Sequence, residues 1–198
     1  MRHSHHRKTR PHYGTYTVLC ILIFVLGSFL LPKITQRSEM KEQTDWHVRW
    51  INQRADYAKT MHQQYGVLPS INLAQAIIES EWGKSTLAEK YHNYYGIKAG
   101  PNEPSVALAT KEYQNGQWQT VTANFAVYNS WENGMAAHTR LLVSGTTWNP
   151  NQYAAVLKAG DYKQAAQALV DAGYATDPTY AAKIVDVIEH WHLQQFDQ

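Results

Sequence analysis

The sequence has almost no cysteine: Cys20 is the only one in 198 residues. A single cysteine excludes an internal disulfide bond. The common metal-binding patterns are missing too, since the sequence contains no H-E-x-x-H motif, no EF-hand loop and no pair of cysteines. A G-x-S-x-G motif is also absent, so nothing indicates a serine nucleophile of that type. We therefore expect neither a metal nor a cofactor.

Charge of either sign is scarce. The formal net charge is only +2, and charged residues make up 17% of the chain. Proteins that bind nucleic acids concentrate positive charge, so this balance indicates no nucleic-acid partner. Hydrophobic residues make up 44%, which is enough for a packed core. The length suits one domain of ordinary size with an appendage.

One long stretch contains no charged residue at all. Residues 11–32 include no Asp, Glu, Lys or Arg, and residues 18–31 are almost wholly apolar. At ~1.5 Å per residue, a helix of this length spans the ~30 Å hydrocarbon core of a bilayer. The sequence therefore predicts a transmembrane signal-anchor at residues 11–32.

The flanks of this stretch predict its orientation. Residues 1–10 carry four basic residues and no acidic one, whereas residues 33–45 carry three of each sign. Basic residues stay on the cytoplasmic side, so residues 1–10 form a cytoplasmic tail and residues 46–198 lie outside. The histidines at positions 3, 5, 6 and 12 add cationic character to that tail. We expect a single-pass protein of the cytoplasmic membrane, with residues 33–45 as a linker.

A cleaved signal peptide, followed by secretion, is the alternative for the N-terminus. Cleavage requires small residues after the apolar run, and Phe29-Leu30-Leu31-Pro32-Lys33-Ile34 is a poor match. Cys20 lies inside the apolar run, where it does not resemble a lipoprotein site. The sequence favours the uncleaved anchor.

Residues 46–198 read as a mainly helical domain with one small β lobe. Apolar spacing and capping residues predict helices at 45–64, 70–83, 86–91, 130–142, 152–158, 161–172 and 179–191. Asn115-Gly116 is a strong hairpin signal and predicts pairing of residues 110–114 with residues 117–128. We expect Ser70 and Ser130 to cap helices, and Pro178 to stand at the first position of the last one.

Glu79 stands out because it lies where a carboxylate is unfavourable. Its helix is rich in apolar residues, and Ile78 and Trp82 are close in sequence. Desolvation favours the protonated carboxyl group and raises its pKa, and such a group can act as a general acid. The alternative is that Glu79 is a surface residue, paired with Glu81 on an exposed last turn.

Several blocks in this order resemble the glucosaminidase-type peptidoglycan hydrolases of glycoside hydrolase family 73. The blocks are Leu73-Ala74-Gln75-Ala76-Ile77-Ile78-Glu79-Ser80-Glu81-Trp82-Gly83, Asn93-Tyr94-Tyr95-Gly96, Thr110-Lys111-Glu112-Tyr113 and Gly173-Tyr174-Ala175-Thr176-Asp177-Pro178. The resemblance runs from about Trp46 to Trp191. It implies a lysozyme-like α+β fold, mainly α, in which the hairpin forms one wall of a cleft.

The resemblance also assigns roles to particular residues. It places the acid on Glu79 and a second carboxylate on Glu112, and it places Tyr174 by the scissile bond. It further implies that sugars are bound by Trp82, Asn93, Tyr94 and Tyr95. The alternatives are a solvated strand residue for Glu112, and core packing for Tyr174 and the other aromatic residues, although Tyr180 fits a core tyrosine better than Tyr174 does. Glu81 and Ala126 depart from the family pattern, in which Gly and Arg are common.

The function that this resemblance implies is hydrolysis of peptidoglycan outside a bacterial membrane. The enzyme would be an endo-β-N-acetylglucosaminidase that cleaves the β-1,4 glycan strand by general acid catalysis. A muramidase or a lytic transglycosylase on the same fold is an alternative. A glycan-binding wall module without catalysis is another, although retention of both Glu79 and Glu112 disfavours it. We also expect the two carboxyl groups to be farther apart without ligand than the ~5–5.5 Å of a retaining pair.

Overall fold

The computed structural model describes the backbone of residues 14–114 and 117–198, and the side chains from residue 37 onward except 111–116 and 118. It divides the chain into two compact units, residues 1–46 and 47–198. Helix α1 (Gly14–Tyr65) contributes residues to both units.

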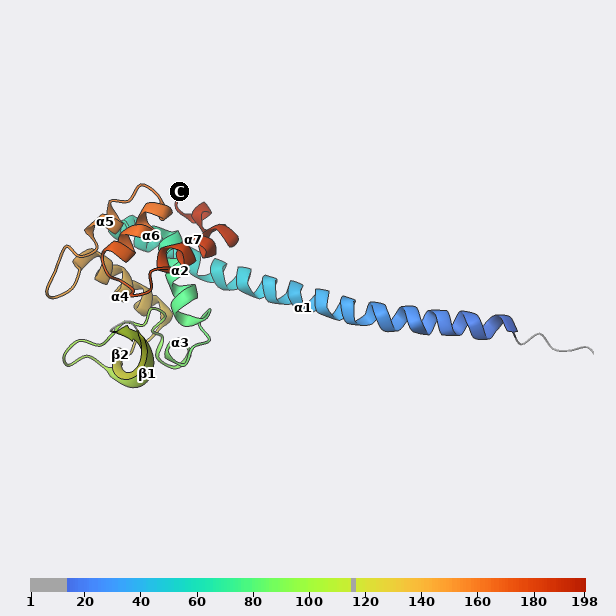
Figure 1. Ribbon diagram of the computed structural model, residues 1–198. Helices are drawn as coiled ribbons and strands as arrows, with labels where there is room; N and C mark the ends of the chain where they lie inside the picture. Colours follow the sequence, from blue (N-terminus) through green and yellow to red (C-terminus); the bar gives the residue numbers. More distant parts are fainter. Residues whose placement is uncertain (1–13, 115–116) are drawn as a thin grey trace, which may run out of the picture. The chain divides into compact units, whose positions relative to one another are not determined.

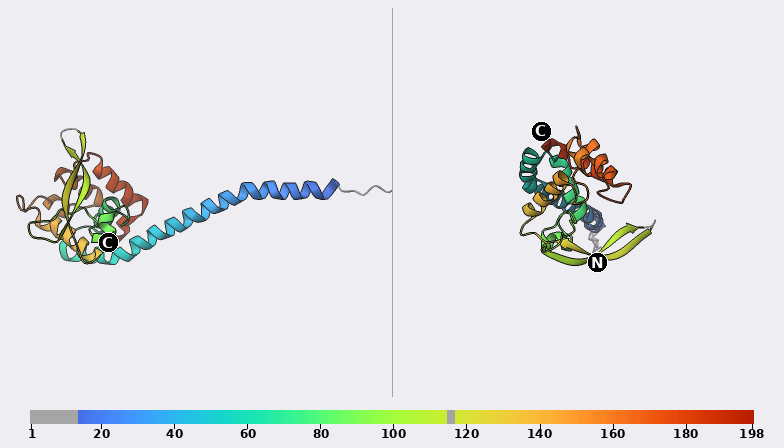
Figure 2. Two further views of the ribbon diagram at one scale, coloured as in Figure 1. Left: turned by 90° about the horizontal axis from the view of Figure 1, so that it is seen from below. Right: turned by 90° about the vertical axis from the view of Figure 1, so that its left-hand side faces the viewer.

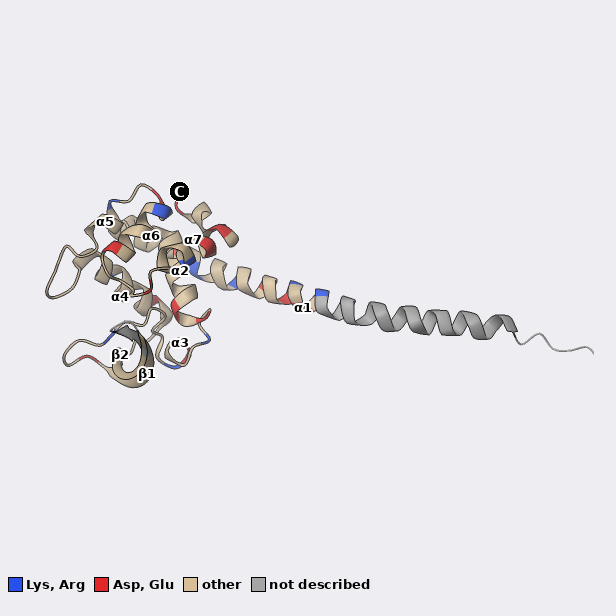
Figure 3. Cartoon of the chain, in the orientation of Figure 1, with Lys and Arg blue, Asp and Glu red and all other residues tan. Residues whose placement is uncertain are grey.

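The first unit is helical throughout its described backbone, including the expected linker at residues 33–45. These residues contain no Gly or Pro and include several good helix formers, among them Lys41, Glu42 and Gln43, so their helical state agrees with their composition, and their role as a linker stays a prediction. Figure 3 shows charges of both signs on α1 from residue 37 onward. Asp45 is therefore an internal residue of the helix rather than its N-cap.

The predicted membrane anchor lies outside the residues whose side chains are described. Within the part of the chain that the structure does describe, no helix has both the length and the apolar character needed to cross a membrane.

Helix α2 (Pro69–Ser80) is the centre of the second unit. Ten of its residues are buried, among them Ile71, Leu73 and Ile77. Around it pack α4 (Trp131–Ser144), α6 (Tyr162–Asp171), α7 (Tyr180–His190) and the 3-10 helix η1 (Leu193–Phe196). Figures 1 and 2 show these helices gathered into one body. The shorter helices are α3 (Thr86–Tyr91) and α5 (Ala154–Leu157).

The helix boundaries test the sequence predictions. The helix at 86–91 is confirmed, and so is the N-cap Ser130, whose side chain accepts from the Asn133 amide. Ser70 is not a cap, because α2 begins at Pro69 and its N-cap position is Leu68. Pro178 is not the first helical residue, because α7 begins two residues later at Tyr180.

The β lobe is one antiparallel hairpin of β1 (Ser105–Gln114) and β2 (Gln117–Ala126). Its register pairs Ser105 with Ala126 and Gln114 with Gln117, as the Asn115-Gly116 signal predicts. Residues 115–116 themselves lie outside the described part. The first strand begins five residues before the predicted Thr110. The second unit is therefore mainly helical with a small two-stranded sheet, which Figures 1 and 2 show to one side of the helices.

Buried polar contacts fix α2 at its N-terminal end. The Asp197 carboxylate accepts from the Ser70 amide across 2.8 Å and from its hydroxyl group across 2.7 Å. Asn72 Oδ1 lies 2.9 Å from His138 Nδ1, which joins α2 to α4. The helix that carries Glu79 is therefore held by specific contacts as well as by apolar packing.

Candidate active site

Helix α2 is followed by a tight left-handed turn. Glu79 is the last residue but one of the helix, two residues before the turn begins. Glu81, Trp82 and Gly83 all have positive φ angles, of 52°, 63° and 81°. The Ser80 hydroxyl group donates to the Ala76 carbonyl oxygen and accepts from the Gly83 amide across 2.7 Å. A Cβ atom on Gly83 would lie 2.8 Å from the Tyr94 ring, so this position requires glycine. The turn thus sets where α2 ends.

Glu79 is half-buried, and two side chains control one of its carboxyl oxygens. The Tyr180 hydroxyl group donates to Glu79 Oε1 across 2.6 Å. Gln75, one helical turn before Glu79, donates from Nε2 to the Tyr180 oxygen across 3.0 Å. Gln75 and Tyr180 are themselves buried. The carboxyl group is thereby held between α2 and α7.

Burial raises the pKa of Glu79 above its ordinary value of 4.5. The Tyr180 hydrogen bond and the positive charge of Lys183 act in the opposite direction, but burial is the larger effect. Glu79 therefore keeps its proton to a higher pH than an exposed glutamate does. This is the property that general acid catalysis requires.

Tyr174 lies next to this network. Its ring stacks on the Tyr180 ring, with centroids 5.8 Å apart and planes 15° apart. The rings of His138 and Tyr153 pack against it edge to face, with ring centroids 5.9 and 6.0 Å from that of Tyr174. Burial, followed by the nearby charge of Glu79, raises the pKa of Tyr174 well above 10, so its hydroxyl group stays protonated. The structure thus brings Tyr174 and Glu79 together through Tyr180.

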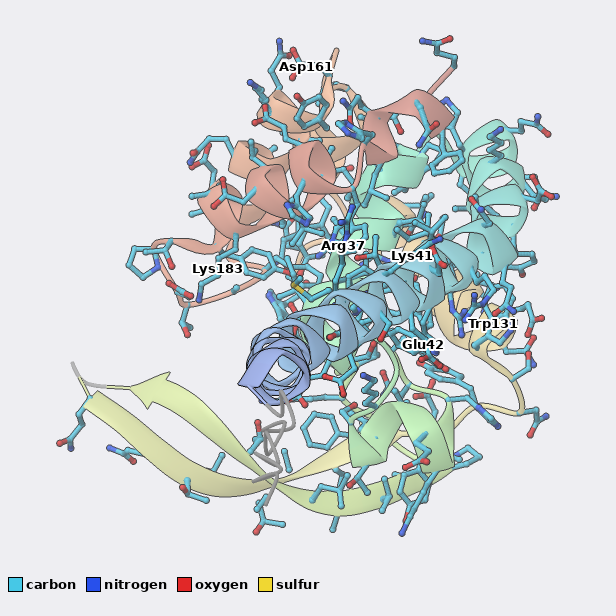
Figure 4. The ribbon with its side chains drawn as sticks, turned by 90° about the vertical axis from the view of Figure 1, so that its right-hand side faces the viewer. Arg37, Lys41, Glu42, Trp131, Asp161 and Lys183 are labelled. Carbon is cyan, nitrogen blue, oxygen red and sulfur yellow. The ribbon has the colours of Figure 1, made fainter. Side chains whose placement is uncertain are left out.

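The loop before α7 carries a local ion pair. Lys183 binds the Asp177 carboxylate, and Asp177 also accepts from the backbone amide of Thr179 across 2.8 Å and from its hydroxyl group across 2.7 Å. Figure 4 labels Lys183 on α7, beside that loop. The Lys183 hydrogen bond is the largest of the effects that lower the pKa of Asp177 to about 2. These contacts fix the loop that leads from Tyr174 into Tyr180.

Glu112 is placed only by its backbone. It lies on β1, opposite Gln119 of β2. Its side chain lies outside the described part of the structure. The separation of the Glu79 and Glu112 carboxyl groups therefore stays a prediction, as does the cleft expected between the helices and the hairpin.

Trp82 lies in an aromatic cluster rather than alone on the surface. Its ring centroid is 4.1 Å from that of His47, 5.0 Å from that of Trp191 and 5.4 Å from that of Trp50. The ring is half-buried. Its packing anchors the left-handed turn after Glu79, and its exposed part is what remains for a sugar.

Asn93 has no free hydrogen-bonding capacity. Its amide group donates to the carbonyl oxygens of Ile97 and Ala126 across 2.8 and 2.9 Å. Its carbonyl oxygen accepts from the amides of Tyr95 and Ile97 across 3.3 and 3.0 Å. An amide has two donors and one oxygen with two acceptor sites, and all four are used. Asn93 therefore shapes its own loop, instead of binding the N-acetyl group as the resemblance implies.

Tyr95 and Tyr94 differ in exposure. Tyr95 is only 3% exposed, stacks on His138 at 4.0 Å and donates to the Asn72 carbonyl oxygen across 3.3 Å. It has no ring face for a sugar, contrary to the role that the resemblance implies. Tyr94 is half-buried and accepts from Arg54 across 3.5 Å. Arg54 in turn lies over the rings of Trp50 and Trp131, the latter labelled in Figure 4.

Sequence reasoning missed three buried residues of the site, of which Gln75 and Tyr180 form the network at Glu79 and His138 contacts Tyr174. Gln75 carries a usable signal, since it lies four residues before Glu79 and therefore on the same side of the helix. Tyr180 was interpreted as a core tyrosine; it is buried, but its hydroxyl group binds Glu79. His138 has no local signal because its contacts are with α2. Burial lowers the pKa of His138 to about 3, so its ring is neutral.

No cluster of three or more His, Cys, Asp or Glu side chains suited to a metal ion occurs among the described residues.

Comparison with known proteins places this chain in a family. The family model described as mannosyl-glycoprotein endo-beta-N-acetylglucosaminidase matches residues 55–193. The catalytic domain of the autolysin Auto from Listeria monocytogenes has a similar fold. The two structures superpose with a TM-score of 0.68 and share 35% sequence identity. The match covers 75% of this chain and 86% of the Auto domain.

Two curated relatives agree with the family match. The exo-glucosaminidase LytG of Bacillus subtilis (strain 168) is 40% identical over 178 residues, which are 90% of this chain and 63% of that protein. The peptidoglycan hydrolase FlgJ of Escherichia coli (strain K12) is 42% identical over 138 residues, which are 67% of this chain and 42% of that protein. The chain thus spans less than two thirds of either relative. By its match to the family model and to these relatives, the chain, with its helical body, its hairpin and the half-buried glutamate near the end of α2, belongs to the glucosaminidase family.

Proposed function

We propose that this protein is a peptidoglycan hydrolase, an endo-β-N-acetylglucosaminidase that cleaves the β-1,4 glycan strand. The observation that carries the proposal is the state of Glu79, a half-buried carboxyl group whose pKa is raised by burial. A neutral carboxylic acid is what protonates the leaving oxygen of a glycosidic bond. Glu79 is therefore the general acid.

The second half of the reaction needs a group that stabilises positive charge on the sugar or activates water. Glu112 on β1 is the proposed carboxylate, and the acetamido group of the substrate is the other source of this help. Tyr174 is proposed to orient that acetamido group or the attacking water through its hydroxyl group. Its position supports this role, because it stacks on the tyrosine that binds Glu79.

The proposed sugar contacts are Trp82 and Tyr94. Both rings are half-buried, and both lie at the turn that follows Glu79, since a Cβ atom on Gly83 would meet Tyr94. Aromatic faces with one exposed side suit the apolar faces of sugar rings. Asn93 and Tyr95 are left out of this set because their polar groups and ring faces are already engaged within the protein.

The proposed location is the outer side of a bacterial cytoplasmic membrane, held by residues 11–32. The uncharged run and the basic residues before it support this proposal. In cell fractionation, the full chain is then expected in the membrane pellet. Secreted material whose N-terminal sequence begins after Leu31 would instead support the cleaved form.

A zymogram tests the proposed activity. The full chain, embedded in a gel with purified cell walls, is expected to clear them, and the Glu79→Gln variant is not. Absence of clearing by the unchanged chain over a broad pH range would favour the alternative of a glycan-binding wall module.

Analysis of the new reducing ends tests which bond is cut. A glucosaminidase leaves reducing N-acetylglucosamine, whereas a muramidase leaves reducing N-acetylmuramic acid and a lytic transglycosylase leaves its anhydro form. Product size separates internal from terminal cleavage, a distinction that matters because LytG is named an exo-glucosaminidase. Release of single sugars alone would contradict the endo assignment.

A further inference from the structure

The hydroxyl group of Tyr180 connects two side chains of α2 from the first position of α7. It donates to Glu79 Oε1 across 2.6 Å and accepts from Gln75 Nε2 across 3.0 Å. Gln75 is 0% exposed and Tyr180 is 4% exposed, so water does not compete for the bond between them. Tyr180 and Glu79 are 101 residues apart in sequence, which makes this contact a product of the tertiary fold.

Gln75 sets the direction of both hydrogen bonds. An amide N–H group can only donate, so the Tyr180 oxygen is the acceptor on that side. The single hydroxyl proton of Tyr180 is then directed at Glu79 Oε1. Because Oε1 must present a lone pair to that proton, the acidic proton of neutral Glu79 is carried by the other oxygen, Oε2.

The second oxygen of Glu79 is open. No hydrogen bond to Oε2 occurs among the described residues, and Oε2 is not one of their buried polar atoms that lack a partner, so it is accessible from outside the protein. We propose that Tyr180, oriented by Gln75, is a positioning residue that keeps the acidic proton of Glu79 on Oε2, the oxygen available to the substrate. This inference rests on the proposed function, in which Glu79 is the general acid.

The other polar groups around α2 leave this role to Tyr180. Lys183 of α7 acts on Glu79 through its charge, but its ammonium group is bound to Asp177. His138 of α4 is neutral and bonds to Asn72, and Asp197 binds the opposite end of α2. Tyr174 stacks on the Tyr180 ring. Among the described residues, only Tyr180 makes a hydrogen bond to the Glu79 carboxyl group.

The test uses three variants of the full chain. Tyr180→Phe removes the hydroxyl group and keeps the ring. Gln75→Met keeps the hydroxyl group but removes the donor that orients it. Tyr162→Phe is the matched control, because Tyr162 donates to Glu189 across 3.0 Å on the exposed side of α6 and α7. It removes the same kind of tyrosine–glutamate hydrogen bond at a place with no role in the proposed reaction.

Turnover of cell-wall glycan is measured against pH for each variant. Tyr180→Phe is expected to lower turnover by about 10- to 100-fold, a part of the full general-acid contribution, and Gln75→Met by about 10-fold. The high-pH limb of the profile should move to higher pH in Tyr180→Phe, because the lost hydrogen bond favours the carboxylate. Tyr162→Phe should reproduce the parent profile.

A second measurement does not depend on activity. The infrared carbonyl band of protonated Glu79, assigned by its absence in Glu79→Gln, is titrated in the parent and in Tyr180→Phe. The midpoint is expected to be higher in Tyr180→Phe. If the parent chain is inactive but this shift is present, the proposed function fails and the positioning role stands.

Two results would overturn the positioning role itself. One is a folded Tyr180→Phe protein with parental turnover and pH profile. The other is a loss of turnover that accompanies a lower thermal unfolding midpoint, while the Glu79 titration stays unchanged, since that pattern belongs to a purely structural tyrosine.

Discussion

At the scale of single residues, the burial of Glu79 acts on catalysis and on stability in opposite directions. Burial raises its pKa, so the folded protein holds this proton more tightly than the unfolded chain does. The same burial means that the ionised form is poorly solvated once the pH exceeds the folded-state pKa. Active sites often carry such a cost, because the groups that react are rarely placed for stability.

The first prediction concerns stability. At pH values below 4.5, the ordinary pKa of a glutamate, Glu79 is protonated in both the folded and the unfolded state, and its carboxyl group favours neither state. As the pH rises through the raised folded-state pKa, the parent protein loses stability. Glu79→Gln has no charge to lose or gain, so its free energy of unfolding should exceed that of the parent by more at neutral pH than at pH 4. Chemical denaturation at both values measures this; an equal difference at the two would contradict it.

The second prediction concerns the unequal roles of the two glutamates. Glu79→Gln is expected to reduce turnover by about 10²-fold or more, because it removes the proton donor. Glu112→Gln is expected to reduce it less, since the substrate acetamido group can substitute. Turnover of both variants is measured on the same cell walls and shows which variant loses more activity. Thermal unfolding verifies that both are folded. A Glu79→Gln protein that keeps most of its activity would refute the mechanism.

The residues around Glu79 show where sequence reasoning succeeds. The burial of Glu79 was predictable because its helix is rich in apolar residues, which is a local property. Tyr180 was recognised as a core tyrosine, but its partner is 101 residues away and no local pattern reveals it. Asn93 and Tyr95 were assigned to the substrate by resemblance, and their hydrogen bonds and stacking within the fold leave little for a ligand.

At the scale of elements, α2 is defined by what happens at its two ends. The C-terminal end needs a left-handed turn of three residues, and the N-terminal end receives a carboxylate from outside the helix. Sequence reasoning ended the helix at Gly83 and capped its other end with Ser70, whereas α2 ends at Ser80 with Glu81 as its C-cap, and its N-cap position is Leu68. The actual partner, Asp197, comes from a distant segment, so local capping rules cannot find it.

The third prediction tests the turn. Gly83 and Gly66 both have φ angles of 81°, but a Cβ atom on Gly66 would meet nothing within 4 Å. Gly66→Ala should therefore lower the free energy of unfolding only by the cost of placing alanine in a left-handed backbone conformation, about 1–2 kcal/mol. Gly83→Ala adds the 2.8 Å approach to Tyr94 and should destabilise more. Denaturant unfolding of the two variants compares them, and equal losses would mean that Tyr94 moves aside without cost.

The fourth prediction tests the distant cap. Asp197→Ala removes the acceptor for both Ser70 bonds and should lower the free energy of unfolding by about 0.5–2 kcal/mol. Asp171→Ala is the control, because Asp171 is exposed and accepts from Gln167 on the same helix. Its expected effect is within about 0.5 kcal/mol. Thermal and chemical unfolding measure both variants. If Asp197→Ala destabilises the protein no more than Asp171→Ala does, Asp197 does not stabilise α2.

At the scale of the whole molecule, the hairpin and the helical body contribute different kinds of order. The body is held by a continuous apolar core around α2, whereas β1 and β2 form a sheet of only two strands. An isolated two-stranded hairpin is marginally stable and depends on the body for support. The hairpin itself was predictable because its turn signal is local, but the helical state of residues 33–45 was not, since their polar composition suits a linker equally well.

The fifth prediction follows from this difference. In a ligand-free crystal structure, the carboxyl groups of Glu79 and Glu112 should be farther apart than the ~5–5.5 Å of a retaining pair. Glycan binding is then expected to bring the hairpin toward the body. A ligand-free separation close to the retaining value would refute this closing movement and leave the role of Glu79 intact.

The contact between Ser70 and Asp197 also has a consequence for the order of events during synthesis. The two residues are 127 positions apart, so at roughly 5–20 residues per second Asp197 is made about 6 to 25 s after Ser70. Tyr180, the partner of Glu79, also follows late. The contacts at both ends of the helix that carries the acid are thus complete only after Asp197 has been made. We expect a nascent chain to be inert toward glycan until then, so that synthesis itself delays the onset of hydrolysis.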